Sequence, residues 1–237
     1  MKVVLDIETV QAPRKEWARL MGIESLREAS SSEVPSDLFE HADFQERVKR
    51  EDDLYERSAF DATFSRIVCI GLLIFTESMT PHGAISWYGQ NEPELLRQFW
   101  ARMGDIRPSL FITHNGLAFD LPFLKKRSII HQVKPTIDIN LARFRTDPVY
   151  DTMAVWSNWD ARGWVKLDVL ARTLNVATKS GSGKQVAEMW AAGEGKAIAE
   201  YCLQDTYVTY ACYQRMMFQD PLPQEDVIGN PVLIDVG

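Results

Sequence analysis

The chain is poor in cysteine and has no long apolar run, and these two absences exclude whole classes of protein. Its 237 residues include three cysteines, Cys69, Cys202 and Cys212, an odd number without a paired spacing. A disulfide framework is therefore not expected, and the thiols are predicted to be reduced, as in a cytoplasmic chain. The longest apolar run, residues 67–75, is too short to cross a bilayer, and no signal peptide precedes the first predicted strand. We expect a cytoplasmic protein without a membrane partner.

An excess of positive charge is also missing. The formal net charge is −7 at pH 7, so no overall basic field attracts nucleic acid. This argues against a protein that coats DNA or RNA, but not against an enzyme whose acidic site is neutralised by metal ions. With 46% hydrophobic and 25% charged residues, the chain can bury a full core.

The order of strand-like and helix-like segments is typical of a mixed α/β layer fold. We expect one domain over residues 1–237, with a charged helical insertion at about 11–63 and an irregular tail from about residue 221. The predicted strands cover residues 2–7, 66–75, 84–89 and 109–115. The predicted helices cover residues 91–103, 119–128, 147–158, 165–175, 182–193 and 196–218.

Two carboxylates at the end of the first predicted strand need a physical explanation. Side chains alternate along a strand, so Asp6 and Glu8 point to the same side, roughly 7 Å apart along the chain. Like charges this close repel each other and raise each other's pKa unless a cation lies between them. The strand end therefore predicts a cation site, although alone it could be an ordinary exposed strand end.

Further carboxylates occur where the predicted elements could bring them to the same place. Asp120 lies at a strand-to-helix junction, and Asp205 lies on the last long helix. Tyr201 precedes Asp205 by one helical turn, a rise of roughly 6 Å, on the same face. The acids of one strand end, one helix start and one helix interior can converge at one end of a sheet.

Together these residues resemble the three motifs of the DEDD (DnaQ-like) 3′–5′ exonucleases. The motifs are Asp-x-Glu at the end of the first strand, Asn-x3-Phe-Asp at residues 115–120 and Tyr-x3-Asp at residues 201–205. The tyrosine is that of the DEDDy subclass. Several longer segments between residues 64 and 215 are also similar to the predicted exonucleases related to the proofreading domain of family B DNA polymerases. The resemblance does not cover the insertion.

The resemblance implies a fold, a reaction and a set of ligands. The fold would be ribonuclease H-like, with a central mixed five-stranded sheet and helices on both faces. Asp6, Glu8 and Asp205 would hold one divalent ion, Mg²⁺ or Mn²⁺, and Asp6 would bridge to a second ion that Asp120 reaches. Tyr201 completes the catalytic set; because a phenol has a pKa near 10, we expect it to orient water rather than act as a base.

The substrate implied by the resemblance is the 3′ end of a single strand, with DNA favoured, and the products are nucleoside 5′-monophosphates. The motifs place Thr9, Asn115, Phe119 and Lys125 as candidates for substrate contacts. Lys126, Arg127, Arg143, Arg145 and Lys166 add a modest phosphate track. A simpler explanation stays open for several: Phe119 could be core, Asn115-Gly116 a turn, and the basic run 125–127 a solvated face.

Three questions stay open at the level of sequence. The chain could instead be a 3′–5′ exoribonuclease, or a non-catalytic module that binds nucleic-acid ends or a polymerase. Any partner polymerase or repair complex would act in trans. Asp151 belongs to the resembled pattern, but helix capping explains it equally well, so it is left out of the catalytic set. The insertion could be a lid over the site or a solvated decoration.

Overall fold

The computed structural model describes residues 1–28, 37–177 and 184–237. The chain forms two compact units. The larger unit consists of Met1–Glu8 and Ile67–Gly237, and the smaller unit is Thr9–Arg66. Within the described residues, no helix combines the length and apolarity needed to cross a bilayer.

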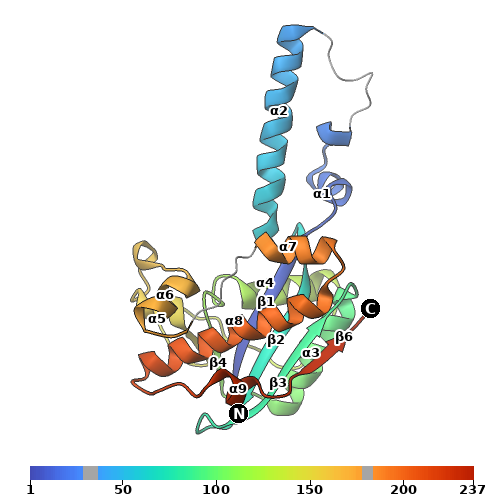
Figure 1. The fold of residues 1–237 in the computed structure, drawn as a ribbon. Coiled ribbons are helices and arrows are strands. Elements are labelled where there is room, and N and C mark those ends of the chain that lie inside the picture. The colour runs from blue at the N-terminus through green and yellow to red at the C-terminus, as the bar shows by residue number, and fades with distance from the viewer. Residues whose placement is uncertain (29–36, 178–183) are drawn as a thin grey trace. The chain divides into compact units, whose positions relative to one another are not determined.

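A six-stranded mixed sheet forms the centre of the larger unit (Figure 1). Its order is β5-β4-β1-β2-β3-β6, so β1 is a central strand. β1 pairs in parallel with β4, β4 with β5, and β3 with β6, whereas β2 and β3 are antiparallel. The strands are β1 (Lys2–Gln11), β2 (Ser65–Phe75), β3 (Pro81–Tyr88), β4 (Leu110–Thr113), β5 (Val149–Asp151) and β6 (Val232–Asp235).

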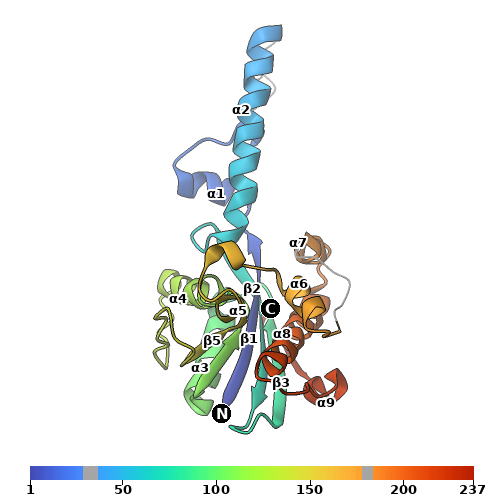
Figure 2. The same ribbon diagram turned by 90° about the vertical axis from the view of Figure 1, so that its left-hand side faces the viewer.

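Helices cover both faces of this sheet, as expected for the fold. Figure 2 shows α3 and α4 on one side, and α6, α7, α8 and α9 on the other. The helices of this unit are α3 (Glu92–Ile106), α4 (Asp120–Ile130), α5 (Thr152–Trp156), α6 (Leu167–Thr173), α7 (Lys184–Ala191), α8 (Gly195–Met216) and α9 (Gln224–Ile228). The mixed α/β fold with helices on both faces is therefore confirmed.

Two details of the predicted sheet differ from the structure. The sheet has six strands instead of five, because the tail expected to be irregular contains α9 and the edge strand β6, which pairs with β3. Residues 149–151, expected to be part of a helix, form β5 before the short helix α5 begins at Thr152. A three-residue strand is specified by its partner β4 rather than by its own pattern.

The core lies between the central strands and α8. Val3, Val4 and Leu5 of β1 are at most 1% exposed, as in strands that are covered on both faces. Tyr210 of α8 stacks on Phe75 of β2, with ring centroids 4.7 Å apart. Gly71 lets the same strand approach α8 closely, since a Cβ there would lie 2.8 Å from the Cys202 sulfur. This packing holds the middle of α8 against the sheet.

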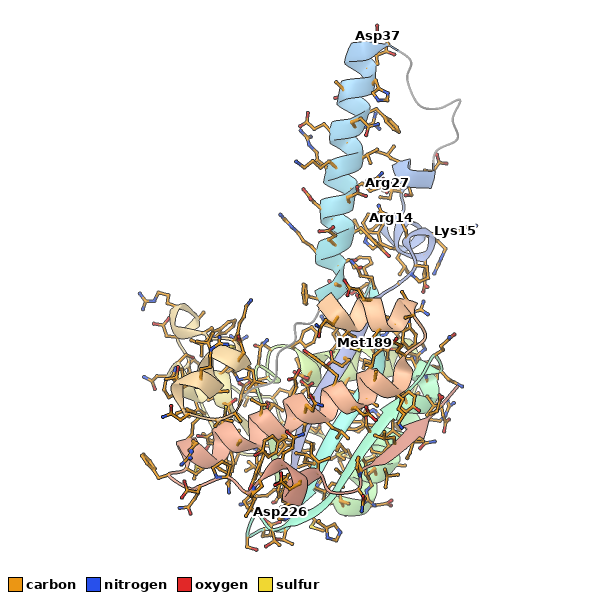
Figure 3. All side chains as sticks on the ribbon, in the orientation of Figure 1. Arg14, Lys15, Arg27, Asp37, Met189 and Asp226 are labelled. Atoms are coloured by element: carbon orange, nitrogen blue, oxygen red, sulfur yellow. The ribbon has the colours of Figure 1, made fainter. Side chains whose placement is uncertain are left out.

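The smaller unit contains α1 (Arg14–Met21) and α2 (Leu38–Arg57), which are joined through ion pairs. Arg14 lies 3.0 Å from Glu51 and 2.8 Å from Asp52, and Arg27 also pairs with Asp52 (Figure 3). Ser25 Oγ and the Leu26 backbone N–H also donate to the Glu51 carboxylate. Burial raises the pKa of Glu51, but the hydrogen bonds from Ser25, Leu26 and Arg14 outweigh it, so the pKa lies below its usual value.

Replacement of Glu51 by glutamine tests this network. At pH 7, Glu51→Gln should lower the free energy of unfolding by about 1–3 kcal/mol, because a buried charged acceptor is lost. Glu51 has a folded-state pKa below its unfolded value of 4.5, so its stabilising effect is present above that pH and disappears as the pH falls through the folded-state pKa. The difference between the two proteins should therefore shrink in acid.

Urea unfolding followed by circular dichroism at several pH values measures this effect. Glu46→Gln is the matched control, because the Glu46–Arg50 pair is exposed and should contribute less than about 0.5 kcal/mol. A Glu51→Gln protein as stable as wild type at pH 7 would contradict the assignment.

Candidate active site

The first two acids of the site, Asp6 and Glu8, lie in the middle of β1, which continues to Gln11 and does not end at residue 7 as predicted. One donor atom each from Asp6, Glu8 and Cys202 lie within 4.8 Å of one another. The Cys202 thiol donates to Asp6 Oδ2 at 3.6 Å and to the Asp6 carbonyl at 3.5 Å. Burial, a hydrogen bond with Cys69 and the nearby acids raise the pKa of Cys202, so the thiol stays protonated and can donate. Cys202 was not predicted as part of the site, although it directly follows Tyr201 on the buried side of α8.

Asp120 reaches the same strand from the other side of the sheet. It is the first residue of α4, and its Oδ1 accepts a hydrogen bond of 3.1 Å from the backbone N–H of Ile7. The carboxylate therefore lies beside the strand segment between Asp6 and Glu8. Burial raises the pKa of Asp120 to about 7, against hydrogen bonds from its own N–H and that of Ile7, and the charge of Asp151 raises it further.

Tyr201 and Asp205 enter from α8, one turn apart. Burial raises the pKa of Tyr201, followed in size by the charge of Asp205, that of Glu8, and a side-chain hydrogen bond with Asp205. A phenol with a raised pKa keeps its proton at neutral pH and can donate it in a hydrogen bond. Tyr201 and Asp205 are both half-buried, and the charges of Glu8 and Asp6 also raise the pKa of Tyr201, so the phenol lies near the acids of β1.

Three of the acids act electrostatically on the fourth, Asp6. Burial raises the pKa of Asp6 well above its usual value, and the charges of Glu8, Asp120 and Asp205 raise it further; only the Cys202 hydrogen bond lowers it. No basic side chain is among the groups that shift the pKa of Asp6. The structure therefore brings the predicted acids together, although Asp120 and Asp205 do not belong to the closest group of donor atoms among the described residues.

This donor set fits a divalent metal ion. A divalent ion would offset the repulsion that raises the pKa of Asp6, and carboxylate oxygens are the ligands that Mg²⁺ and Mn²⁺ prefer. A divalent ion could be held by the carboxylates of Asp6, Glu8, Asp120 and Asp205. Cys202 adds a softer sulfur atom at the edge of the same group.

Asp151 has a larger structural role than helix capping alone. Its Oδ1 accepts from the N–H groups of Met153 and Ala154 at the start of α5, and from Asn115 N–H at 3.0 Å. Its Oδ2 accepts from Leu117 N–H at 2.9 Å. One buried carboxylate thus joins α5 to the loop that leads from β4 to Asp120. Its position before a short helix was the only sequence signal for this role.

The candidates for substrate contacts have different surroundings. Asn115 has a left-handed backbone, φ 66°, and its carbonyl accepts from the N–H of Phe119 at 2.9 Å, so the expected turn is present. Phe119 is half-exposed and lies 5.3 Å from the Phe123 ring, and Lys125 is exposed on α4. Thr9 belongs to the smaller unit, where its hydroxyl donates to the Ala59 carbonyl at 3.5 Å. These contacts do not show whether Thr9, Asn115, Phe119 and Lys125 bind substrate, so their roles stay predictions.

Arg127 is not available for a phosphate track. Its guanidinium donates to Glu92 through Nε at 2.8 Å and Nη2 at 2.6 Å, and it is 9% exposed. His131 lies 2.7 Å from the same carboxylate. The prediction for Arg127 was wrong because its partner, 35 residues away in sequence, is brought to it only by the packing of α3 on α4. Lys126, Arg143, Arg145 and Lys166 are exposed.

The fold and the site together define a class. A mixed sheet with helices on both faces, and acids gathered on and beside its central strand, is the arrangement of a ribonuclease H-like domain. The chain belongs to the family described as predicted 3′–5′ exonucleases related to the exonuclease domain of PolB, whose model matches residues 58–229. Asp6 and Glu8 precede the matched range, whereas Asp120, Tyr201 and Asp205 lie within it.

Sequence relatives are DNA polymerases of much greater length. The chain is 29% identical over 161 residues to a DNA polymerase of Pyrococcus glycovorans, a match that covers 60% of this chain and 20% of the polymerase. It is 27% identical over 163 residues to a catalytic subunit of DNA polymerase epsilon from Arabidopsis thaliana, covering 61% of this chain and 8% of that protein. The chain therefore spans one fifth or less of these two relatives, and their polymerase activity is not transferred to it.

Metal addition tests the acid cluster without any assay of activity. Mn²⁺ at about 100 times its Kd should raise the thermal midpoint by about 5 °C or more, because binding to the folded state alone adds about 2.7 kcal/mol. Asp6→Asn should abolish the shift and raise the midpoint of the metal-free protein, because one of several repelling charges is removed.

Differential scanning fluorimetry with and without Mn²⁺ measures both effects. Asp226→Asn is the control: Asp226 is exposed on α9, near the end of the sheet where β1 begins (Figures 1 and 3), and should leave the shift unchanged. A full Mn²⁺ shift in the Asp6→Asn protein would rule out the cluster as the binding site.

Substitution of Asp151 tests whether its carboxylate joins α5 to the loop before Asp120. Asp151→Asn should lower the free energy of unfolding by about 2–3 kcal/mol, because an amide oxygen cannot replace both carboxylate oxygens for four backbone donors. Asp160→Asn is the comparison, since Asp160 is an exposed cap of a single short turn and should cost less than about 1 kcal/mol. Urea denaturation measures the free energy of unfolding of both variants. Equal small decreases in the two proteins would refute this structural role of Asp151.

Proposed function

We propose that the protein is a metal-dependent 3′–5′ exonuclease that removes nucleoside 5′-monophosphates from the 3′ end of single-stranded nucleic acid, with DNA favoured. The observation that carries the proposal is the gathering of acids from β1, α4 and α8 around Asp6, whose pKa is raised by burial and by the charges of Glu8, Asp120 and Asp205. Membership of a family of predicted 3′–5′ exonucleases gives the reaction class. A module that only binds nucleic-acid ends would have no need to keep these acids together.

The acids have distinct proposed roles. Asp6, Glu8, Asp120 and Asp205 would hold the divalent ions, Mg²⁺ or Mn²⁺: Asp6, Glu8 and Asp205 one of them, and Asp120 with Asp6 a second. When bound, such ions lower the pKa of the attacking water and stabilise the charge that develops on the phosphate and the leaving 3′ oxygen. Asp120 is held for its task by the Ile7 N–H, and the Cys202 thiol orients the Asp6 carboxylate by hydrogen bonding.

Tyr201 is a hydrogen-bond donor in this scheme, not a general base. Its pKa lies above the value of an ordinary phenol, so a deprotonated form is rare at neutral pH. Its O–H donates to Asp205, which fixes the direction of the phenol, and the phenol oxygen accepts a hydrogen bond from the attacking water and so orients it. Orientation of this kind lowers the barrier because the water is held ready for attack.

The substrate end must be unpaired to reach these groups. The acids are buried to half-buried at the end of a sheet, and a base-paired terminus would keep its last phosphate away from them. Thr9, Asn115, Phe119 and Lys125 remain the proposed contacts for the terminal nucleotides. Because the sequence relatives are DNA polymerases, we include proofreading for a polymerase bound in trans as a proposed use of the activity.

A degradation assay tests the proposal. A 5′-labelled single-stranded DNA should be shortened from its 3′ end in the presence of Mn²⁺ and should stay intact with a chelator. Asp6→Ala and Asp205→Ala should remove turnover, whereas Tyr201→Phe should lower kcat by about 10- to 100-fold and keep the Mn²⁺-induced thermal shift.

The same assay separates the alternatives. Faster shortening of a matched RNA strand would identify an exoribonuclease, and loss of the Mn²⁺ shift in Tyr201→Phe would overturn the orienting role. No shortening of any DNA or RNA strand by wild-type protein with Mn²⁺ would refute the proposed function altogether.

A further inference from the structure

A group of exposed aromatic side chains lies in residues 143–166, outside the acid cluster. Phe144 is 77% exposed, Trp156 42% and Trp164 48%, which is uncommon for side chains of this size. Trp159 of the same segment is half-buried. Four large rings within 21 residues of one chain segment, in a unit that otherwise has a well-packed core, indicate a surface that binds something.

The rings are held in defined positions. Phe144 and Trp159 pack against each other, with centroids 5.5 Å apart and planes tilted by 49°. Both have a left-handed backbone, φ 63° and 64°, which is costly for bulky residues and is found where the surroundings enforce it. The turn between Trp156 and Trp164 closes tightly, since a Cβ on Gly163 would lie 3.1 Å from the Ser157 Cβ. The surrounding structure therefore holds these rings in defined positions.

Hydrogen bonds connect this segment to the loop of the acid cluster. The Val165 carbonyl, next to Trp164, lies 3.1 Å from Nε2 of His114. Burial lowers the pKa of His114, so its ring is neutral at pH 7 and Nε2 carries the proton that the carbonyl accepts. His114 precedes Asn115, whose N–H is bound by Asp151 at the start of α5. The aromatic segment and the turn before Asp120 thus share one hydrogen-bonded support.

Exposed basic residues lie next to these aromatic residues in the sequence. Arg143 and Arg145 flank Phe144, and Lys166 follows Trp164 after one residue. All three are exposed, and none forms an ion pair with another residue in the part of the chain that the structure describes. Arg162 differs, because it pairs with Asp160 at 2.7 Å. In a chain of net charge −7, unpaired cations around exposed rings favour an anionic, aromatic ligand.

We propose that Phe144, Trp159 and Trp164 form a stacking platform for the bases of the single strand whose 3′ end enters the acid cluster. Arg143 and Arg145 would contact the phosphates of the same stretch. Base stacking on aromatic rings, combined with cations that follow the backbone, is how proteins hold single strands without reading their sequence. The inference rests on the proposed function and adds to it a second binding region outside the acid cluster.

Binding of strands of different length tests the platform. All proteins carry Asp205→Asn, so that no strand is cut, and the probes are a 12-nucleotide oligo(dT) and the dinucleotide dTdT. Phe144→Leu and Trp164→Leu should each raise the Kd for the 12-mer at least about fivefold, the loss that corresponds to one stacked base. Binding of the dinucleotide, which cannot reach beyond the 3′ end, should stay unchanged.

Three controls separate stacking from other effects. Phe144→Tyr keeps the ring and should keep wild-type affinity, whereas leucine keeps only the apolar character. Phe218→Leu removes a 96% exposed ring outside the segment and should leave the Kd unchanged. Arg143→Gln and Arg145→Gln should each reduce the slope of log Kd against log[salt] by about 0.7. Arg97→Gln removes a cation that is already paired with Glu94, so it should leave this slope unchanged.

The outcomes distinguish this inference from the proposed function. Unchanged affinity of Phe144→Leu and Trp164→Leu for the 12-mer, or an equal loss in Phe218→Leu, would overturn the platform even if wild-type protein degrades DNA. If wild-type protein with Mn²⁺ degrades no strand but the ring variants still weaken 12-mer binding, the platform stands and the exonuclease proposal fails.

Discussion

Repulsion among buried and half-buried carboxylates around the middle of β1 is the constraint on which the site depends. Burial raises the free energy of the charged form of Asp6, and the charges of Glu8, Asp120 and Asp205 raise it further. Such an arrangement destabilises the metal-free fold unless protons or cations are bound. A divalent ion converts the same charges into ligands. The acids are therefore best understood as a prepared cation site, and the reaction class of the family follows from the chemistry such a site supports.

The surrounding fold holds these charges in place against their repulsion. β1 is flanked by β4 and β2, and its residues Val3 to Leu5 are buried in the core. α8 is kept close to the sheet at Gly71, which positions its acidic turn. Asp120 is bound to the backbone of β1, and Asp151 holds the loop before it. Asp6 and Asp120 are thus held by hydrogen bonds that do not depend on a bound ion.

Local patterns indicated acids that the structure brings near one another, but they did not indicate the neighbours of these acids. Asp6 and Glu8 follow from strand alternation, and Tyr201 with Asp205 follows from helical spacing; both patterns involve only nearby residues. The features that were missed depend on distant parts of the chain. β5 and β6 form because β4 and β3 offer them partners, and Arg127 is neutralised by Glu92, 35 residues away. Cys202 joins the acids only because β2 and α8 approach at Gly71.

The most direct test of the central claim is anomalous X-ray scattering from a crystal of the wild-type protein soaked in Mn²⁺. The account predicts at least one anomalous peak within coordination distance of carboxylate oxygens of Asp6 and Glu8, with Asp205 or Asp120 completing the set. A crystal that binds Mn²⁺ only at other positions, or in which these four carboxylates turn away from one another toward solvent or toward Lys and Arg side chains, would contradict it.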